Sequence, residues 1–171
     1  LFVHLHWKVI HTELNGIHLS RQTETQTNIQ NFYRYDYNIL NPSCNIYNGN
    51  KGNVRRLEFP IMQWLIANTY FIFGDYIVVT RFCMIFFAII GFLGIYKLFY
   101  LLLHNEAVAL MGSALFLFSP LYYFYAINPM PDVFSLVCAI WFLYYFLLYI
   151  KSKQNSKLWL SAIFMSLSIL A

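Results

Sequence analysis

Three runs of apolar residues are each long enough to cross a membrane as a helix. They cover residues 76–103, 107–127 and 133–150, and a fourth run begins at residue 158 and continues to the end of the sequence at residue 171. A bilayer core about 30 Å thick needs roughly 20 apolar residues in a helix. The pattern therefore predicts several transmembrane spans within residues 76–171, the last of them truncated.

The first 75 residues follow a different pattern. Residues 1–10 are apolar but include His4, His6 and Lys8, so we expect them to be the end of an earlier span. A polar region follows, and it contains the turn-forming runs NPSCN and NGNKGN. We predict that residues 11–75 form one long loop between spans.

Two helices are expected inside this loop. One covers about residues 20–35, where Ser20 can cap the first turn and three side chains supply an apolar edge at helical spacing, namely Ile29, Phe32 and Tyr33. The other covers residues 59–74, which are apolar but too few for a full span. We interpret it as an interfacial or re-entrant helix.

The composition supports the membrane interpretation. The sequence has 171 residues, of which 60% are hydrophobic and only 11% charged, whereas soluble domains carry about 25% charged residues. So few charges exclude a soluble enzyme, a disordered chain and a nucleic-acid-binding protein. The predicted fold class is an all-α polytopic membrane protein. Because both ends lie within apolar runs, we interpret the sequence as an internal fragment of a longer protein.

Charge alone leaves the orientation in the membrane open. Four lysines lie on one predicted side, namely Lys97, Lys151, Lys153 and Lys157. The long loop on the other side holds five basic residues, which are Arg21, Arg34, Lys51, Arg55 and Arg56. Positive residues favour the cytoplasmic side, so the two sides compete.

Three carboxylates are candidates for chemistry. Glu24 follows Arg21 by three residues on the predicted helix, where it could be catalytic or simply a solvated ion-pair partner. Glu58 directly precedes the second loop helix, and Asp132 lies at the start of a span. Each of these two could instead complement a helix dipole.

Arg81 is the candidate cation. It lies five residues into an apolar span, where a charge needs a partner or an anionic ligand unless it reaches the interface. The histidines His4, His6, His11 and His18 do not have the spacing of a metal site, so we predict none.

The run SRQTETQTNIQNFY, residues 20–33, resembles the first outer loop of polyprenyl-phosphate-dependent membrane glycosyltransferases. This family includes the protein O-mannosyltransferases and the aminoarabinose transferase that acts on lipid A. Ser20, Glu24 and Gln30 depart from the family's pattern, although glutamate in place of aspartate keeps the carboxylate. The positions that follow the pattern are Arg21, Gln22, Glu24 (as a carboxylate), Thr25, Ile29, Asn31, Phe32 and Tyr33.

The resemblance continues downstream in the family's order. LEFPIMQWLIA is similar to the family's second juxtamembrane helix, and Arg81 matches an arginine at the start of the next span. FSPLYYFYAINPMPDVFSL is similar to a later stretch that ends in Pro-Asp. The ordered matches cover most of residues 18–136.

The resemblance implies the N-terminal part of a GT-C fold of glycosyltransferase family 39. It also implies an active site outside the membrane, so that residues 11–75 are the outer loop of a multi-pass protein, and we expect the bacterial plasma membrane. The reaction would move a sugar from a polyprenyl-phosphate donor to a glycan, lipid or protein acceptor, with inversion. The expected partners are membrane lipids, this donor and the glycan, lipid or protein acceptor, and no nucleic acid is expected. No cofactor or obligatory metal is expected, although a divalent metal is left open.

The same resemblance implies roles for the candidate residues. Glu24 would be the general base or would orient the acceptor. Arg81, with Arg55 and Arg56 as further candidates, would stabilise the phosphate leaving group. The remaining candidates would bind substrate, namely Arg21, Glu58 and Asp132.

Two other classes remain as alternatives. A non-enzymatic transporter or lipid-handling protein would use similar spans, but it should carry ionisable residues at midplane depth, and this sequence has almost none. A small free-standing membrane protein without activity is the third possibility, and it requires both ends of the sequence to be natural.

Overall fold

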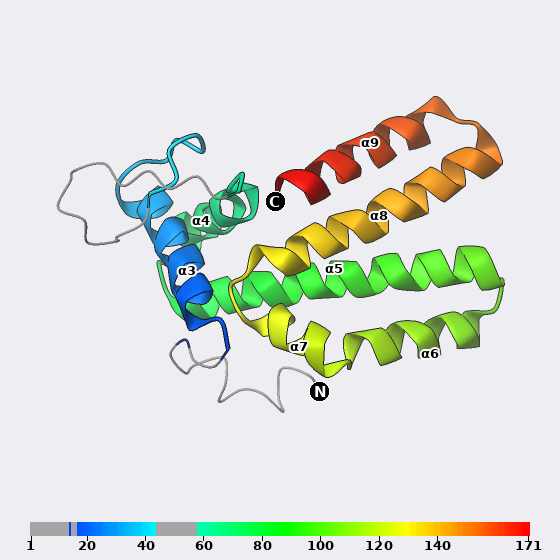
Figure 1. Ribbon diagram of the computed structural model, residues 1–171, viewed down its shortest axis with the longest axis horizontal. Coiled ribbons are helices and arrows are strands. Elements are labelled where there is room, and N and C mark those ends of the chain that lie inside the picture. Colours follow the sequence, from blue (N-terminus) through cyan, green and yellow to red (C-terminus); the bar gives the residue numbers. More distant parts are fainter. Residues whose placement is uncertain (1–13, 15–16, 44–57) are drawn as a thin grey trace. The chain divides into compact units, whose positions relative to one another are not determined.

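The computed structural model describes residues 14, 17–43 and 58–171, and the predicted span end at residues 1–10 lies outside them. Seven helices and no strand lie within the described residues (Figure 1). Their bounds are Leu19–Arg34 (α3), Ile61–Phe73 (α4), Ile77–Leu103 (α5), Glu106–Leu117 (α6), Pro120–Ile127 (α7), Pro131–Ser152 (α8) and Asn155–Leu170 (α9). The predicted all-α class is confirmed.

The chain divides into two compact units. Unit 1 consists of Leu1–Met84 and Ile127–Pro131, and unit 2 consists of Ile85–Ala126 and Asp132–Ala171. Unit 1 therefore contains α3, α4 and the first residues of α5. Unit 2 contains the rest of α5, together with α6, α9 and nearly all of α7 and α8.

In unit 1, α3 packs against α4. The contact has an apolar core in which each side chain is at most 2% exposed: Ile29 and Phe32 from α3, and Met62, Ile66 and Ala67 from α4. The Tyr33 ring adds edge-on contacts to Tyr70 and Phe71. Burying each large apolar side chain contributes about 1.5–3 kcal/mol, which fixes α3 on α4.

Two helices, α5 and α8, are long and apolar enough to cross a membrane, with 27 and 22 residues. The sequence predicts a single span over residues 107–127, whereas the structure divides this segment into α6 and α7, bent by 64°. Pro120 explains the break, because proline has no N–H to continue the helix and its ring clashes with the preceding turn. Ser119 Oγ then accepts a hydrogen bond from the Tyr122 N–H (3.3 Å) and caps α7.

Glycines allow the helices of unit 2 to approach closely. A methyl group at Gly91 would come within 2.6 Å of the Tyr122 hydroxyl, and one at Gly94 within 2.9 Å of Ile140. Two side chains also donate hydrogen bonds to backbone carbonyls of α5: the Tyr122 hydroxyl to Ala88 (3.1 Å) and the Trp141 indole to Ile90 (3.2 Å). Small residues and hydrogen bonds between helices are the usual basis of packing in membranes.

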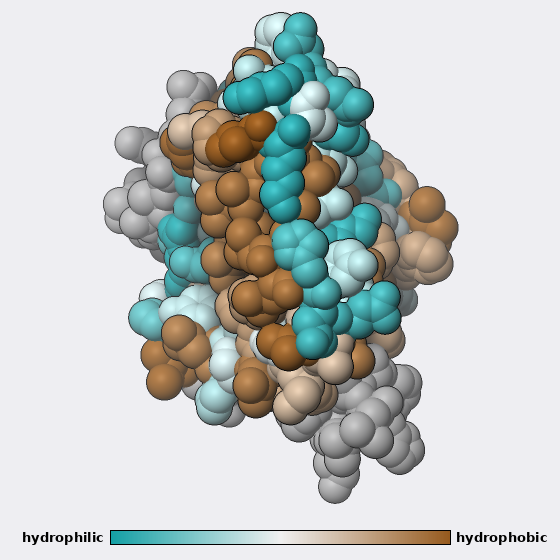
Figure 2. All heavy atoms as spheres, turned by 90° about the vertical axis from the view of Figure 1, so that its right-hand side faces the viewer, coloured by the Kyte–Doolittle hydropathy of each residue, from teal (hydrophilic) through white to brown (hydrophobic). Residues whose placement is uncertain are grey.

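The two turns of unit 2 that join α5 to α6 and α8 to α9 lie at one end. The Lys151 ammonium donates a hydrogen bond to the Leu101 carbonyl (3.0 Å), which ties the turns together. Lys97 lies 5.2 Å from the centre of the Trp141 ring, a cation–π contact. Figure 2 views this end and shows hydrophilic side chains running across an otherwise apolar surface.

Candidate functional site

A small polar cleft lies in unit 1 between α3 and the beginning of α4. About 10 Å³ of it is open to the centre of a water molecule, which is room for about one water. Two of the predicted carboxylates, Glu24 and Glu58, line this cleft together with Arg21. The other lining residues are Thr25, Asn28, Pro42, Pro60 and Gln63.

An ion pair joins the two sides of the cleft. The Arg21 guanidinium on α3 donates to Glu58 Oε2, and the two side chains are 34% and 20% exposed. The other Glu58 oxygen, Oε1, accepts a hydrogen bond from the Gln63 amide (3.3 Å) on α4. Glu58 therefore does more than complement the dipole of α4, because its carboxylate links that helix to α3.

Glu24 lies one helical turn after Arg21 on α3 and is half-buried at the cleft. The predicted spacing of Arg21 and Glu24 on one face of α3 corresponds to their common position at the cleft, and Asn28, four residues after Glu24, lines the cleft as well. A carboxylate at this position can accept a hydrogen bond or a proton from a group bound in the cleft. The cleft thus combines an acceptor carboxylate with an ion pair that holds its walls.

Next to the cleft, a chain of hydrogen bonds joins three helices of unit 1. The Gln26 amide on α3 donates to the Tyr70 hydroxyl on α4 (2.8 Å), and that hydroxyl is hydrogen-bonded to Thr80 Oγ1 on α5 (2.5 Å). The three residues are 7%, 1% and 0% exposed. Burial raises the pKa of the Tyr70 hydroxyl above its ordinary value, so the phenol stays neutral.

Arg81 directly follows Thr80 in α5 and is also buried, with 1% of its surface exposed. A second ion pair of unit 1, between Arg34 and Asp75, lies between the end of α3 and the segment that precedes α5. Holding the Arg81 cation inside the apolar helix α5 is costly, so the burial of Arg81 points to an anionic ligand or partner.

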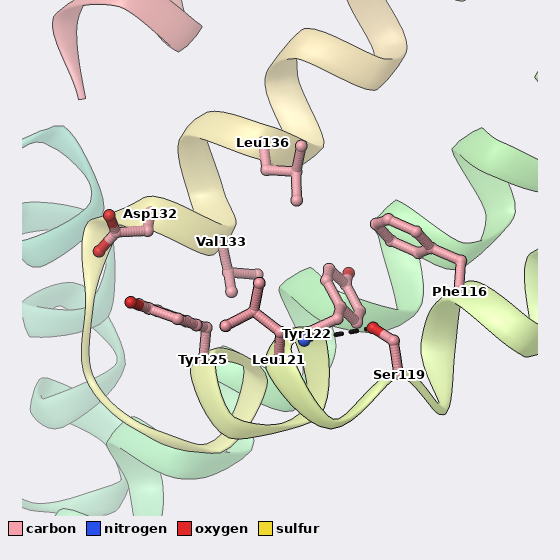
Figure 3. A pocket seen from close by; sticks show the side chains of 8 residues that line it. All are labelled: Phe116, Ser119, Leu121, Tyr122, Tyr125, Asp132, Val133 and Leu136. Carbon is pink, nitrogen blue, oxygen red and sulfur yellow. Dashed lines mark hydrogen bonds between the residues drawn. The ribbon is translucent and has the colours of Figure 1, made fainter. Parts of the chain in front are cut away.

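Asp132 lies in unit 2, so its position relative to the cleft is not determined. It lines a separate pocket of about 180 Å³ between α7 and α8 (Figure 3). In that view, Asp132 and the Tyr125 hydroxyl lie on one side of the pocket and Phe116 on the other. The remaining lining residues are Ser119, Leu121, Tyr122, Val133 and Leu136.

The structure therefore brings together three of the predicted site residues, namely Arg21, Glu24 and Glu58. Arg55 and Arg56 lie outside the described residues. Within the described part of the chain, no group of three or more His, Cys, Asp or Glu side chains could hold a metal ion.

Four buried polar residues were not predicted from the sequence, namely Gln26, Gln63, Tyr70 and Thr80. Amides and hydroxyls on a mostly polar helix are usually solvated, so the residue type alone did not indicate that Gln26 is buried. One signal was present: Gln22 and Gln26 share the helix face that also carries Ile29, and all three are at most 7% exposed.

Comparison with known proteins identifies the family. A sequence model of the dolichyl-phosphate-mannose-protein mannosyltransferase family matches residues 58–171, about two thirds of the chain. The match includes Glu58, Arg81 and Asp132 but begins after α3. Neither a curated protein nor a solved structure gives a significant match. The match to residues 58–171 and the apolar helices α5 and α8 together place this chain in the dolichyl-phosphate-mannose-protein mannosyltransferase family of membrane glycosyltransferases.

Proposed function

We propose that this protein transfers a sugar from a polyprenyl-phosphate donor to an acceptor hydroxyl, and that the cleft between α3 and α4 is where the acceptor binds. The observation that carries the proposal is the meeting of Glu24 with the Arg21–Glu58 ion pair at one cleft, in a chain of this family. Glycan, lipid and protein hydroxyls all fit the proposed chemistry. No cofactor enters it, because the lipid phosphate already activates the sugar.

In the proposed reaction, the acceptor oxygen bonds to the anomeric carbon as the bond from that carbon to the phosphate oxygen breaks. The acceptor proton passes to the Glu24 carboxylate, and polyprenyl phosphate leaves with the electron pair of the broken bond. Attack from the side opposite the phosphate inverts the anomeric configuration. The cleft has room for about one water, so the acceptor must displace lining side chains when it binds.

The leaving phosphate gains negative charge in the transition state and therefore needs cations close by. Arg81 is the proposed phosphate-binding cation because it is charged, buried and carried by the same unit as Glu24. Arg55 and Arg56 are further candidates for this role. Arg21 and Glu58 are proposed to orient the acceptor, and Asp132 to bind substrate.

To test the donor, the full natural chain can be purified in detergent and supplied with a hydroxyl acceptor and one of two radiolabelled mannose donors. We expect transfer from polyprenyl-phosphate mannose and none from a nucleotide-linked mannose, because in the proposed reaction Arg81 binds the single phosphate of a lipid-linked donor. Transfer from the nucleotide donor alone would contradict the proposal. A heated sample is the control for non-enzymatic transfer.

We further propose that α3 and α4 lie on the outer side of a bacterial plasma membrane. The lysine-bearing end of unit 2 supports this orientation. Lys151 lies in the last turn of α8 and Lys153 between α8 and α9, and lysines at and near short loops favour the cytoplasm. The long loop's arginines weigh less because long loops follow the rule poorly.

Cysteine labelling tests the orientation. In a Cys44→Ser background, Thr23→Cys on the exposed side of α3 should react with a membrane-impermeant maleimide in intact spheroplasts. Gln154→Cys, on the exposed turn between α8 and α9, should react only after permeabilisation. The opposite pattern would contradict the proposed orientation, and the Cys44→Ser background alone controls for the remaining cysteines.

A further inference from the structure

The hydrogen-bond chain Gln26–Tyr70–Thr80 has features of a positioning device. It links α3, α4 and α5, and every member is at least nine-tenths buried. None of the three residues lines the polar cleft, so none of them is placed to touch a substrate there. Any effect they have on the reaction must therefore act through other residues.

The chain is well satisfied at its centre. The Tyr70 hydroxyl oxygen accepts a hydrogen bond from the Gln26 amide, and its proton can be donated to Thr80 Oγ1. Such bonds are directional, unlike the apolar contacts of Ile29 and Phe32, which would tolerate small rotations or slides of α3. Losing one member would leave buried polar groups with unmet hydrogen bonds, at a cost in free energy.

The ends of the chain lie next to the proposed reactive groups. Gln26 is two residues after Glu24 on α3, and Thr80 directly precedes Arg81 on α5. All four residues belong to unit 1. Because helices are stiff over two residues, fixing Gln26 against Thr80 also fixes where the backbone carries Glu24 relative to Arg81.

We propose that Gln26, Tyr70 and Thr80 are positioning residues for sugar transfer, which hold the Glu24 carboxylate in register with the Arg81 guanidinium. This inference rests on the proposed function, in which Glu24 acts on the acceptor and Arg81 on the phosphate. Small displacements of reacting groups lower the reaction rate by large factors. The loss of a hydrogen bond in this chain should therefore lower kcat more than it weakens donor binding.

Tyr70→Phe tests the inference because it removes only the hydroxyl and keeps the ring that contacts Tyr33. In the full natural chain, with polyprenyl-phosphate mannose as donor, we expect kcat to fall about tenfold while KM for the donor changes less than twofold. Thr80→Val should lower kcat similarly, and Thr80→Ser, which keeps the hydroxyl, should restore it. Combining Tyr70→Phe with Thr80→Val should cost little more than either change alone.

Tyr33→Phe is the matched control, because it removes a hydroxyl from a neighbouring ring that is not part of the chain, and its kcat should equal that of the wild type. A wild-type kcat for Tyr70→Phe would overturn the inference. So would a lower midpoint of thermal unfolding with an unchanged kcat well below that midpoint, since that result indicates a role in stability alone.

Glu24→Gln, measured in parallel, separates this inference from the proposed function. If Glu24→Gln is inactive and Tyr70→Phe has the wild-type kcat, the positioning role fails and the proposed function survives. If Glu24→Gln transfers at the wild-type rate, the role of Glu24 in the proposed function fails and the positioning role fails with it, whereas no transfer by the wild type would contradict the proposed reaction itself.

Discussion

Glu24→Gln is expected to reduce sugar transfer by a factor of about 10²–10⁴, the usual contribution of a general base. Glutamine has nearly the same size and shape as glutamate, so the cleft between α3 and α4 should keep its form. The amide cannot take the acceptor's proton, however, and that loss falls on the chemical step. The measurement is the initial rate of mannose transfer from the polyprenyl-phosphate donor, at equal amounts of membrane-inserted protein.

Two further variants sharpen this prediction. Glu24→Asp keeps the carboxylate and should retain part of the activity. Glu106→Gln is the matched control, because Glu106 is an exposed glutamate at the lysine-bearing end of unit 2. The Glu106→Gln protein should transfer sugar at the wild-type rate. A Glu24→Gln protein that inserts normally and keeps the wild-type rate would remove Glu24 from the mechanism.

Arg81→Gln is expected to lower kcat/KM for the lipid-phosphate donor by a factor of about 10²–10³, the typical effect of losing a group that stabilises developing charge. The Arg81 side chain is 1% exposed, so solvent does not screen its charge as it would at a surface. Arg81→Lys keeps a point charge but loses the two-pronged geometry, so it should show an intermediate rate. Steady-state rates at varied donor concentration measure both effects.

Arg34→Gln is the control for Arg81. Arg34 forms an ion pair with Asp75, but its side chain is 48% exposed, and such pairs contribute at most about 1 kcal/mol to stability. Its rate should therefore match the wild type. If Arg81→Gln retains the wild-type kcat/KM in correctly inserted protein, the phosphate is held by other residues.

The membrane-protein class could be predicted from the sequence because hydropathy acts over long runs. α5 and α8 contain few charges along 27 and 22 residues, so no local signal competes with the apolar one. The bend between α6 and α7 was missed for the same reason: averaged hydropathy over residues 107–127 hides the single Pro120 that interrupts the backbone hydrogen bonds. The family was also recognisable, through motifs in the right order.

The site was only partly predictable. Helical spacing places Arg21 and Glu24 on one face, which is local information. The ion pair of Arg21 with Glu58 joins residues 37 positions apart, and nothing in the local pattern indicates it. Gln26 and Tyr70 are 44 positions apart, and their meeting depends on the packing of α3 against α4. Contacts of this kind require the tertiary structure.

The proposed function is tested most directly by comparing wild type and Glu24→Gln side by side in one assay of mannose transfer from polyprenyl phosphate to a hydroxyl acceptor. We expect donor consumption and product formation by the wild type, and both reduced by a factor of about 10²–10⁴ in the variant at equal membrane insertion. Equal rates for the two proteins would contradict the assignment of the cleft as the acceptor site. No consumption of the donor by the wild type, with any class of hydroxyl acceptor, would contradict the proposed reaction itself.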